Sequence, residues 1–162
     1  MRINPKSKLI HHQEKSNWCW AAAASHVSDC IAGYLDQCQI ASISLPACTG
    51  NCSSTACNIP YYLDRALSMI NHFNSWHSGQ IPVEQIKYEL ANGRPVCVRI
   101  GWGNGTNGHF VVIVGYSVSN RKIPFYLIYD PDPKTGFHAV KQNAFRSSYK
   151  ISGYWSESIL TE

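Results

Sequence analysis

The stretch Trp18-Cys19-Trp20-Ala21-Ala22-Ala23-Ala24 joins a cysteine to a run of four alanines. Alanine has the highest helix propensity and Ser16 or Asn17 is a suitable N-cap, so this stretch predicts a helix that begins beside Cys19. Apolar residues continue at helical spacing as far as Gly33, which predicts a buried helix of about four turns. Free backbone N–H groups and the helix dipole favour an anion at the start of a helix. We therefore expect Cys19 to be held as a thiolate, the form of cysteine that attacks carbonyl carbon.

His109 is the strongest candidate for a base that cooperates with this cysteine. Such a pair must be close in space but not in sequence. His109 follows the glycine-rich segment 101–108, which predicts a loop, and precedes the apolar run Phe110–Val114, which predicts a buried strand. Among the other histidines, His11 and His12 are expected in an N-terminal extension. Surface or packing roles are expected for the remaining four, which are His26, His72, His77 and His138.

Asp130 is the candidate that would orient the imidazole. It ends a second strand-like run, Phe125–Tyr129. If the two runs pair as a hairpin, the start of the first strand lies beside the end of the second, and His109 and Asp130 become neighbours. Aspartate is also common in turns, so Asp132 and Asn143 stay open as alternatives.

Together these residues resemble the papain-like cysteine peptidase superfamily, both in their order and in their spacing. The most specific feature is a glutamine, Gln13, six residues before the cysteine. Further motifs resemble a compact bacterial group that includes bacteriocin leader peptidases and peptidase effectors of plant pathogens. These motifs are Trp18–Ala22, Gln37–Ala41, Gly93–Val96, His109–Tyr116 and Asp130-Pro131. The resemblance covers nearly the whole chain.

The resemblance implies a role for each residue of the motif. Cys19 is the expected nucleophile, His109 the general base and later acid, and Asp130 the orienting group. Gln13 is expected to complete an oxyanion hole with the backbone N–H of Cys19. Papain has asparagine at the place of Asp130, whereas many bacterial relatives have aspartate. No cofactor is expected.

The rest of the chain predicts a single α+β domain over residues 1–162. We expect a helical part over about 17–93, with further helices that open at Pro60 and Pro82 and pack with the nucleophile helix. From residue 94 onward, short apolar runs predict an antiparallel sheet. The sheet runs lie near 96–100, 110–116, 125–129, 137–140 and 151–159.

The active site is expected where the start of the nucleophile helix meets the sheet. Trp102 and the loop 103–108 would form one wall of the substrate groove. Trp20, Trp102 and Gly108 are the expected substrate-binding residues, with Tyr116 and Tyr154 as further apolar lining.

Five of the seven cysteines lie within 28 positions, namely Cys30, Cys38, Cys48, Cys52 and Cys57. The segment 36–58 has little periodicity and predicts a loop held by disulfides, as in proteins of oxidising compartments. We expect two bridges in this cluster, with their connectivity open, and a buried Cys97. A zinc site is the alternative, but no C-x-x-C pair occurs, so no metal is expected.

Charge and hydropathy bear on the partners. The net charge of +4 comes from dispersed lysines and arginines, which gives no support to nucleic-acid binding. No stretch approaches the ~18 apolar residues of a membrane span, and residues 1–17 lack the apolar core of a signal peptide. We expect a monomer that is secreted or delivered into a target cell or periplasm and acts on a protein or peptide. An immunity or inhibitor protein is a further candidate partner.

The preferred function is hydrolysis of peptide or isopeptide bonds through an acyl-enzyme thioester on Cys19. A transglutaminase-like amide transferase is one alternative, because it uses the same Cys-His-Asp order and differs in whether an amine or water accepts the acyl group. A papain-like module that only binds peptides is the other alternative. Loss of the nucleophile or the base would mark such a module, and both are present here.

Overall fold

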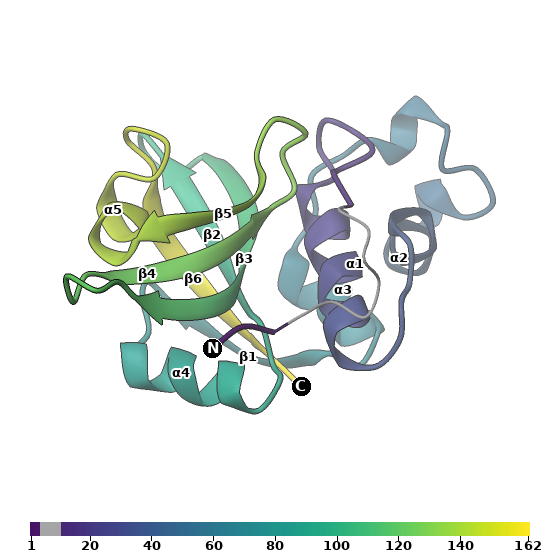
Figure 1. Cartoon of the computed structure of the whole chain (residues 1–162). Coiled ribbons are helices and arrows are strands. Elements are labelled where there is room, and N and C mark those ends of the chain that lie inside the picture. Colours follow the sequence, from purple (N-terminus) through teal and green to yellow (C-terminus); the bar gives the residue numbers. More distant parts are fainter. Residues whose placement is uncertain (4–10) are drawn as a thin grey trace.

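A computed structural model describes residues 1–3 and 11–162 (Figure 1). In this part of the chain six strands form one antiparallel sheet in the order β1-β6-β2-β3-β4-β5. The strands are β1 (Phe73–Ser78), β2 (Val96–Trp102), β3 (Asn107–Val118), β4 (Pro124–Asp130), β5 (Gly136–Lys141) and β6 (Tyr154–Thr161). The helices are α1 (Cys19–Ile31), α2 (Gln37–Ser44), α3 (Leu63–Met69), α4 (Val83–Ala91) and α5 (Gln142–Ser147), with short 3-10 turns η1 (Pro46–Cys48) and η2 (Thr55–Cys57).

The sheet separates two apolar cores because neighbouring residues of a strand point to opposite faces. Val112 and Val114 of β3 pack with the buried residues of α1, α2 and α3. Val111 and Ile113 face the other core, which α4 and α5 help to cover. Figure 1 accordingly shows α1, α2 and α3 grouped beside the sheet, away from α4 and α5. This is the α+β arrangement that the sequence predicts.

Helix α1 begins at Cys19 and is almost entirely buried. The expected N-cap was wrong: the cap residue is Trp18, which makes no side-chain capping bond. Ser16 and Asn17 instead hydrogen-bond with Asn58, so their polar groups fix the segment before α1 to the chain that precedes α3. The Trp18 indole adds a buried hydrogen bond, from Nε1 to the carbonyl of Cys57 at 2.8 Å. Contacts distant in sequence therefore fix the start of α1.

Several expected element boundaries were wrong. The segment 36–58 contains helix α2, which a capping box formed by Asp36 and Gln39 begins. Strand β1 lies inside the expected helical part and pairs with β6, and helix α5 lies inside the expected sheet part. Helix α3 begins at Leu63 and not at Pro60. Helix α4 packs on the sheet core with Ile86 and not beside α1.

Two disulfides join the clustered cysteines, Cys38 to Cys52 and Cys48 to Cys57. The predicted number of bridges is therefore confirmed, and the structure supplies the connectivity. Cys30 is a free buried thiol, and so is Cys97 on β2, as expected. The first bridge ties the segment between α2 and α3 to helix α2, and the second joins η1 to η2 within that segment and is buried in the helical core.

The β3 and β4 strands form the expected hairpin. Val112 pairs with Tyr129, and Ile113 with Ile128. This register continues from Val112 toward the beginning of β3, so that His109 comes to lie beside Asp130 at the end of β4.

Candidate active site

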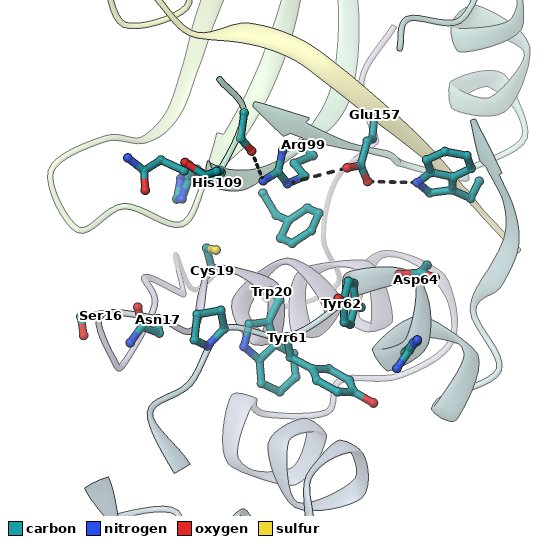
Figure 2. Close-up of a pocket in the computed structure, with 18 residues that line it drawn as sticks. Ser16, Asn17, Cys19, Trp20, Tyr61, Tyr62, Asp64, Arg99, His109 and Glu157 are labelled. Atoms are coloured by element: carbon teal, nitrogen blue, oxygen red, sulfur yellow. Dashed lines mark hydrogen bonds and ion pairs between the residues drawn. The ribbon is translucent and has the colours of Figure 1, made fainter. Parts of the chain in front are cut away.

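Cys19 is the first residue of α1, and its side chain faces His109 of β3 across a gap between helix and sheet (Figure 2). Both side chains line the same cleft, Cys19 is near enough to raise the pKa of His109, and Cys19 is partly exposed to solvent. Among the described residues, 1–3 and 11–162, none accepts a hydrogen bond from the backbone N–H of Cys19. A partly exposed thiol, an imidazole and a free N–H therefore meet at one point.

The imidazole of His109 is held by Asp130. His109 Nε2 lies 2.6 Å from Asp130 Oδ1, and the carboxylate is fully buried. Burial lowers the pKa of His109, but the hydrogen bonds and charges of Asp130 and Cys19 outweigh burial and raise this pKa from 6.5 to about 9. The imidazole is therefore charged at neutral pH.

Asp130 makes further bonds that the sequence analysis missed. Its Oδ1 also accepts from the Asp132 backbone N–H at 2.9 Å, and its Oδ2 accepts from the Tyr149 hydroxyl at 2.6 Å. The Lys150 ammonium lies 2.9 Å from the same Oδ2. Burial raises the pKa of Asp130, but these donors together with His109 hold it well below its usual range. No local motif marks Tyr149 or Lys150, because they come from a turn distant in sequence.

Gln13 lies near this cluster, in a pocket that His109 also lines. Its backbone N–H donates to the Pro131 carbonyl at 2.8 Å. Its side-chain amide donates to the carbonyls of Lys15 and Ser16, at 3.0 and 2.8 Å. In this structure Gln13 thus stabilises the turn that leads to Cys19.

A cleft of about 880 Å³ extends from Cys19 and His109 between the helical part and the sheet. One wall carries Tyr61, Tyr62 and Asp64, and the sheet wall carries Arg99 and Glu157 (Figure 2). Contacts between side chains and with the backbone hold the sheet wall in place. Arg99 donates to the Gly105 carbonyl at 2.9 Å and lies 3.8 Å from Glu157, which in turn accepts from the Trp76 indole at 3.0 Å. The cleft is therefore both aromatic and charged.

A model of the Peptidase C39 like family matches residues 4–157. The chain belongs to this family. It is accordingly a papain-like cysteine protease, which agrees with the fold and with the meeting of Cys19 and His109. A comparison with curated proteins gives no match.

Solved structures share the fold of this C39-like peptidase. The peptidase domain of Streptococcus ComA, described as a bi-functional ABC transporter of a quorum-sensing pathway, is 16% identical, with a TM-score of 0.58 over 93% of this chain and 95% of that one. The bromelain protease of Ananas comosus is 14% identical, with a TM-score of 0.61 over 96% and 94%. The ragweed pollen allergen Amb a 11, a cysteine protease solved in its proform, is 13% identical, with a TM-score of 0.60 over 96% of this chain and 63% of that one.

The expected substrate-binding residues of the C39-like peptidase fall in three different places. Gly108 lines the cleft with the loop that precedes it. Trp20 lies under the cleft but is fully buried, and its indole donates to the Ile59 carbonyl, so it supports the floor. Trp102 lines the neighbouring pocket of about 720 Å³ with Gln13, on the other side of His109.

The expectation for Tyr116 was wrong. It lies toward the far end of β3, where the Lys87 ammonium sits over its ring and Tyr126 is the neighbouring aromatic. Tyr154 lies behind the glycine-rich loop, close to the backbone of Gly101 and Gly105. Neither tyrosine is among the described residues that line the cleft or the neighbouring pocket.

Among residues 1–3 and 11–162, no group of three or more His, Cys, Asp or Glu side chains is arranged to hold a metal ion. Within the same ranges, no helix has the length and apolar character needed to cross a bilayer.

Proposed function

We propose that this chain hydrolyses peptide or isopeptide bonds through an acyl-enzyme thioester on Cys19. The observation that carries the proposal is the contact of Cys19, at the start of α1, with a His109 imidazole bonded at 2.6 Å to a buried Asp130. A thiol next to an imidazole that a third group orients is the usual arrangement of an activated nucleophile. We propose that the chain acts as one domain, because both sides of the site are needed.

The proposed reaction begins with attack of the Cys19 thiolate on the carbonyl carbon of the scissile bond. The imidazolium of His109 then gives its proton to the leaving amine as the C–N bond breaks and the thioester remains. His109, now neutral, accepts a proton from water as the water oxygen attacks the thioester. Breakdown of that intermediate releases the carboxylic acid and returns the thiolate and imidazolium pair. Asp130 keeps the imidazole oriented throughout.

We propose that the free N–H of Cys19 and the amide of Gln13 bind the oxyanion that forms in both attacks. The Gln13 amide would exchange one of its bonds to the turn carbonyls for a bond to this oxygen. Replacement by alanine (Gln13→Ala) is expected to lower kcat by about 100-fold, the usual effect of removing one oxyanion donor. Because the Gln13 amide also stabilises the turn, urea unfolding of Gln13→Ala beside wild type separates a loss of stability from the loss of the oxyanion donor.

The proposed setting is outside the cell that makes the protein, by secretion or by delivery into a target cell or periplasm. The two disulfides support an oxidising compartment. We propose a monomer that binds a protein or peptide substrate, with an immunity or inhibitor protein as a further candidate partner. A bacterial effector or toxin is the role that accords best with these features.

The hydrolytic step is tested with a peptide library digested in heavy-oxygen water, with and without a primary amine. We expect new carboxyl termini that carry one heavy oxygen, and Cys19→Ala is expected to produce none. Amide adducts of the added amine in place of new acids would instead indicate the transglutaminase-like alternative. Equal product from wild type and Cys19→Ala would contradict the proposal. No product from wild type would also contradict it and would leave the peptide-binding module as the better account.

A further inference from the structure

The feature that carries a further inference is the turn between α5 and β6, which brings two donors to one oxygen of Asp130. The Tyr149 hydroxyl lies 2.6 Å from Asp130 Oδ2, and the Lys150 ammonium 2.9 Å from it. Lys150 also lies 3.0 Å from Asp132 Oδ2 and 2.9 Å from the Thr135 hydroxyl. The ammonium thus joins two carboxylates, while the other oxygen of Asp130 is left to His109 and a backbone N–H.

The backbone of this turn is strained in the conformation that makes these contacts. Lys150 has φ of 45° and Ile151 has φ of 83°, in the left-handed region that residues other than glycine rarely adopt and that is least favourable for the β-branched Ile151. The turn is closed by reciprocal backbone bonds of 2.8 Å between Tyr149 and Gly153. The Ile151 side chain is 94% exposed, so its packing does not explain the strain. The contacts of Tyr149 and Lys150 with Asp130 offset it.

We propose that Lys150 is a positioning residue that acts through Asp130 on His109. By holding Oδ2, it turns Oδ1 toward the imidazole. By its positive charge, it weakens the attraction of Asp130 for the imidazolium proton, which His109 must release to the leaving amine. This inference rests on the proposed function for its catalytic meaning, but its effect on His109 can be measured without a substrate.

The charged and titratable groups around His109 come from several elements. They are Glu14 and Lys15 before α1, Cys19 on α1, Arg99 on β2, Asp130 on β4, Asp132 after β4, and Tyr149 and Lys150 before β6, with His138 on β5 bonded to Tyr149. Burial lowers the pKa of Lys150, but its bonds to Asp130 and Asp132 outweigh burial and raise it, so the ammonium stays charged over the working range. Lys150 is therefore a fixed positive charge next to the carboxylate that binds His109.

The direction in which Lys150 shifts the pKa of His109 follows from the charges around it. Removal of the ammonium in Lys150→Met leaves the carboxylates of Asp130 and Asp132 without their cation, which favours imidazolium and raises the pKa of His109. Removal of a negative charge in Asp132→Asn does the opposite and lowers it. Because Lys150 and Asp132 are both partly exposed, we expect each variant to shift the pKa of His109 by about 0.5 pH unit, upward for Lys150→Met and downward for Asp132→Asn. A loss of packing alone would not shift the pKa of His109 in opposite directions in the two variants.

The experiment follows the His109 ring by NMR through a pH titration in the intact protein, together with the pH profile of Cys19 alkylation. The variants are Lys150→Met, Asp132→Asn and Lys150→Arg, which keeps the charge. Lys87→Met is the matched control, since Lys87 forms a lysine–carboxylate pair with Glu84 on α4, remote from the site. We expect the His109 midpoint to shift upward in Lys150→Met and downward in Asp132→Asn. It is expected to stay near the wild-type value in Lys150→Arg and to be unchanged in Lys87→Met.

Equal His109 midpoints in wild type, Lys150→Met and Asp132→Asn would overturn the inference. If Lys150→Met does not fold, the downward shift in Asp132→Asn supports the inference and an unchanged midpoint overturns it. Failure of the proposed function has a different signature, because wild type would then fail to cleave peptides while the His109 midpoint still responds to Lys150.

Discussion

At the scale of single residues, the pair formed by His109 and Asp130 is where the fold and the chemistry meet. The imidazole lies at the mouth of the cleft, and the carboxylate behind it is fully buried and receives hydrogen bonds on both oxygens. A buried charge is tolerated only with such compensation. The ion pair that the proposed chemistry needs is therefore also part of what stabilises the fold.

This coupling predicts a pH dependence of stability. The pKa of His109 rises from 6.5 to about 9 in the folded state, so its stabilising contribution is complete below about pH 6.5 and is lost as the pH rises through 9. Wild type is expected to lose up to about 3 kcal/mol more unfolding free energy than His109→Gln over this window. Urea unfolding at pH 6 and pH 9 measures the difference, and equal losses in the two proteins would contradict the assignment.

Among the structural elements, the segment that carries both disulfides, residues 38–57, fixes the start of α1. The bridge of Cys48 and Cys57 is fully buried, and the carbonyl of Cys57 accepts the Trp18 indole N–H one residue before Cys19. The other bridge, which closes a loop of similar length from Cys38, is partly exposed. We therefore expect the two bridges to differ more in their connection to the active site than in their contribution to the stability of the fold.

Removal of each bridge tests this difference. Each double replacement by alanine, of Cys48 with Cys57 or of Cys38 with Cys52, is expected to lower the unfolding free energy by about 2 to 3 kcal/mol, since the loops are short. Only the first is expected to slow alkylation of Cys19, because it loosens the support of Trp18. Urea titration and alkylation rates provide the two readouts. A larger slowing in the second variant would show that the support runs through another contact.

A second prediction at the level of elements concerns Gly108, near the start of β3. A Cβ added at Gly108 would clash with the Arg99 guanidinium group. Arg99 can swing aside, so Gly108→Ala should cost less than about 1 kcal/mol of stability. The displaced arginine loses its bond to Gly105 and reshapes the cleft wall. We expect KM to rise about 5-fold with kcat nearly unchanged, and a fall in kcat with constant KM would contradict this view of the cleft.

The sequence predicted the elements whose signal is local and periodic. The alanines after Cys19 predict α1, and the apolar runs around His109 and Asp130 predict the hairpin that brings those two residues together. Strand β1 was missed because its residues alternate in burial without an apolar run, and pairing with β6 decides its conformation. Lys150 was missed because a strained turn has no local signature.

At the scale of the whole molecule, the proposed site exists only where two parts of the chain meet. The helical part supplies Cys19, and the sheet supplies His109 and Asp130. The resemblance to papain-like peptidases implied this division from motif order alone. The walls of the cleft could not be predicted in the same way, since Arg99 and Glu157 face Tyr62 only in the folded chain. Specificity therefore depends on the tertiary structure.

Activation of Cys19 by His109 is tested by brief exposure of the non-reduced protein to a substoichiometric thiol alkylator, followed by intact mass measurement and peptide mapping. We predict one label, on Cys19. Burial raises the pKa of Cys30 to about 12 and raises that of Cys97 further, so neither buried thiol should react, and the other cysteines are in disulfides. In His109→Ala the labelling of Cys19 is expected to slow by about tenfold or more. An unreactive Cys19, or a rate that is the same with and without His109, would contradict the account.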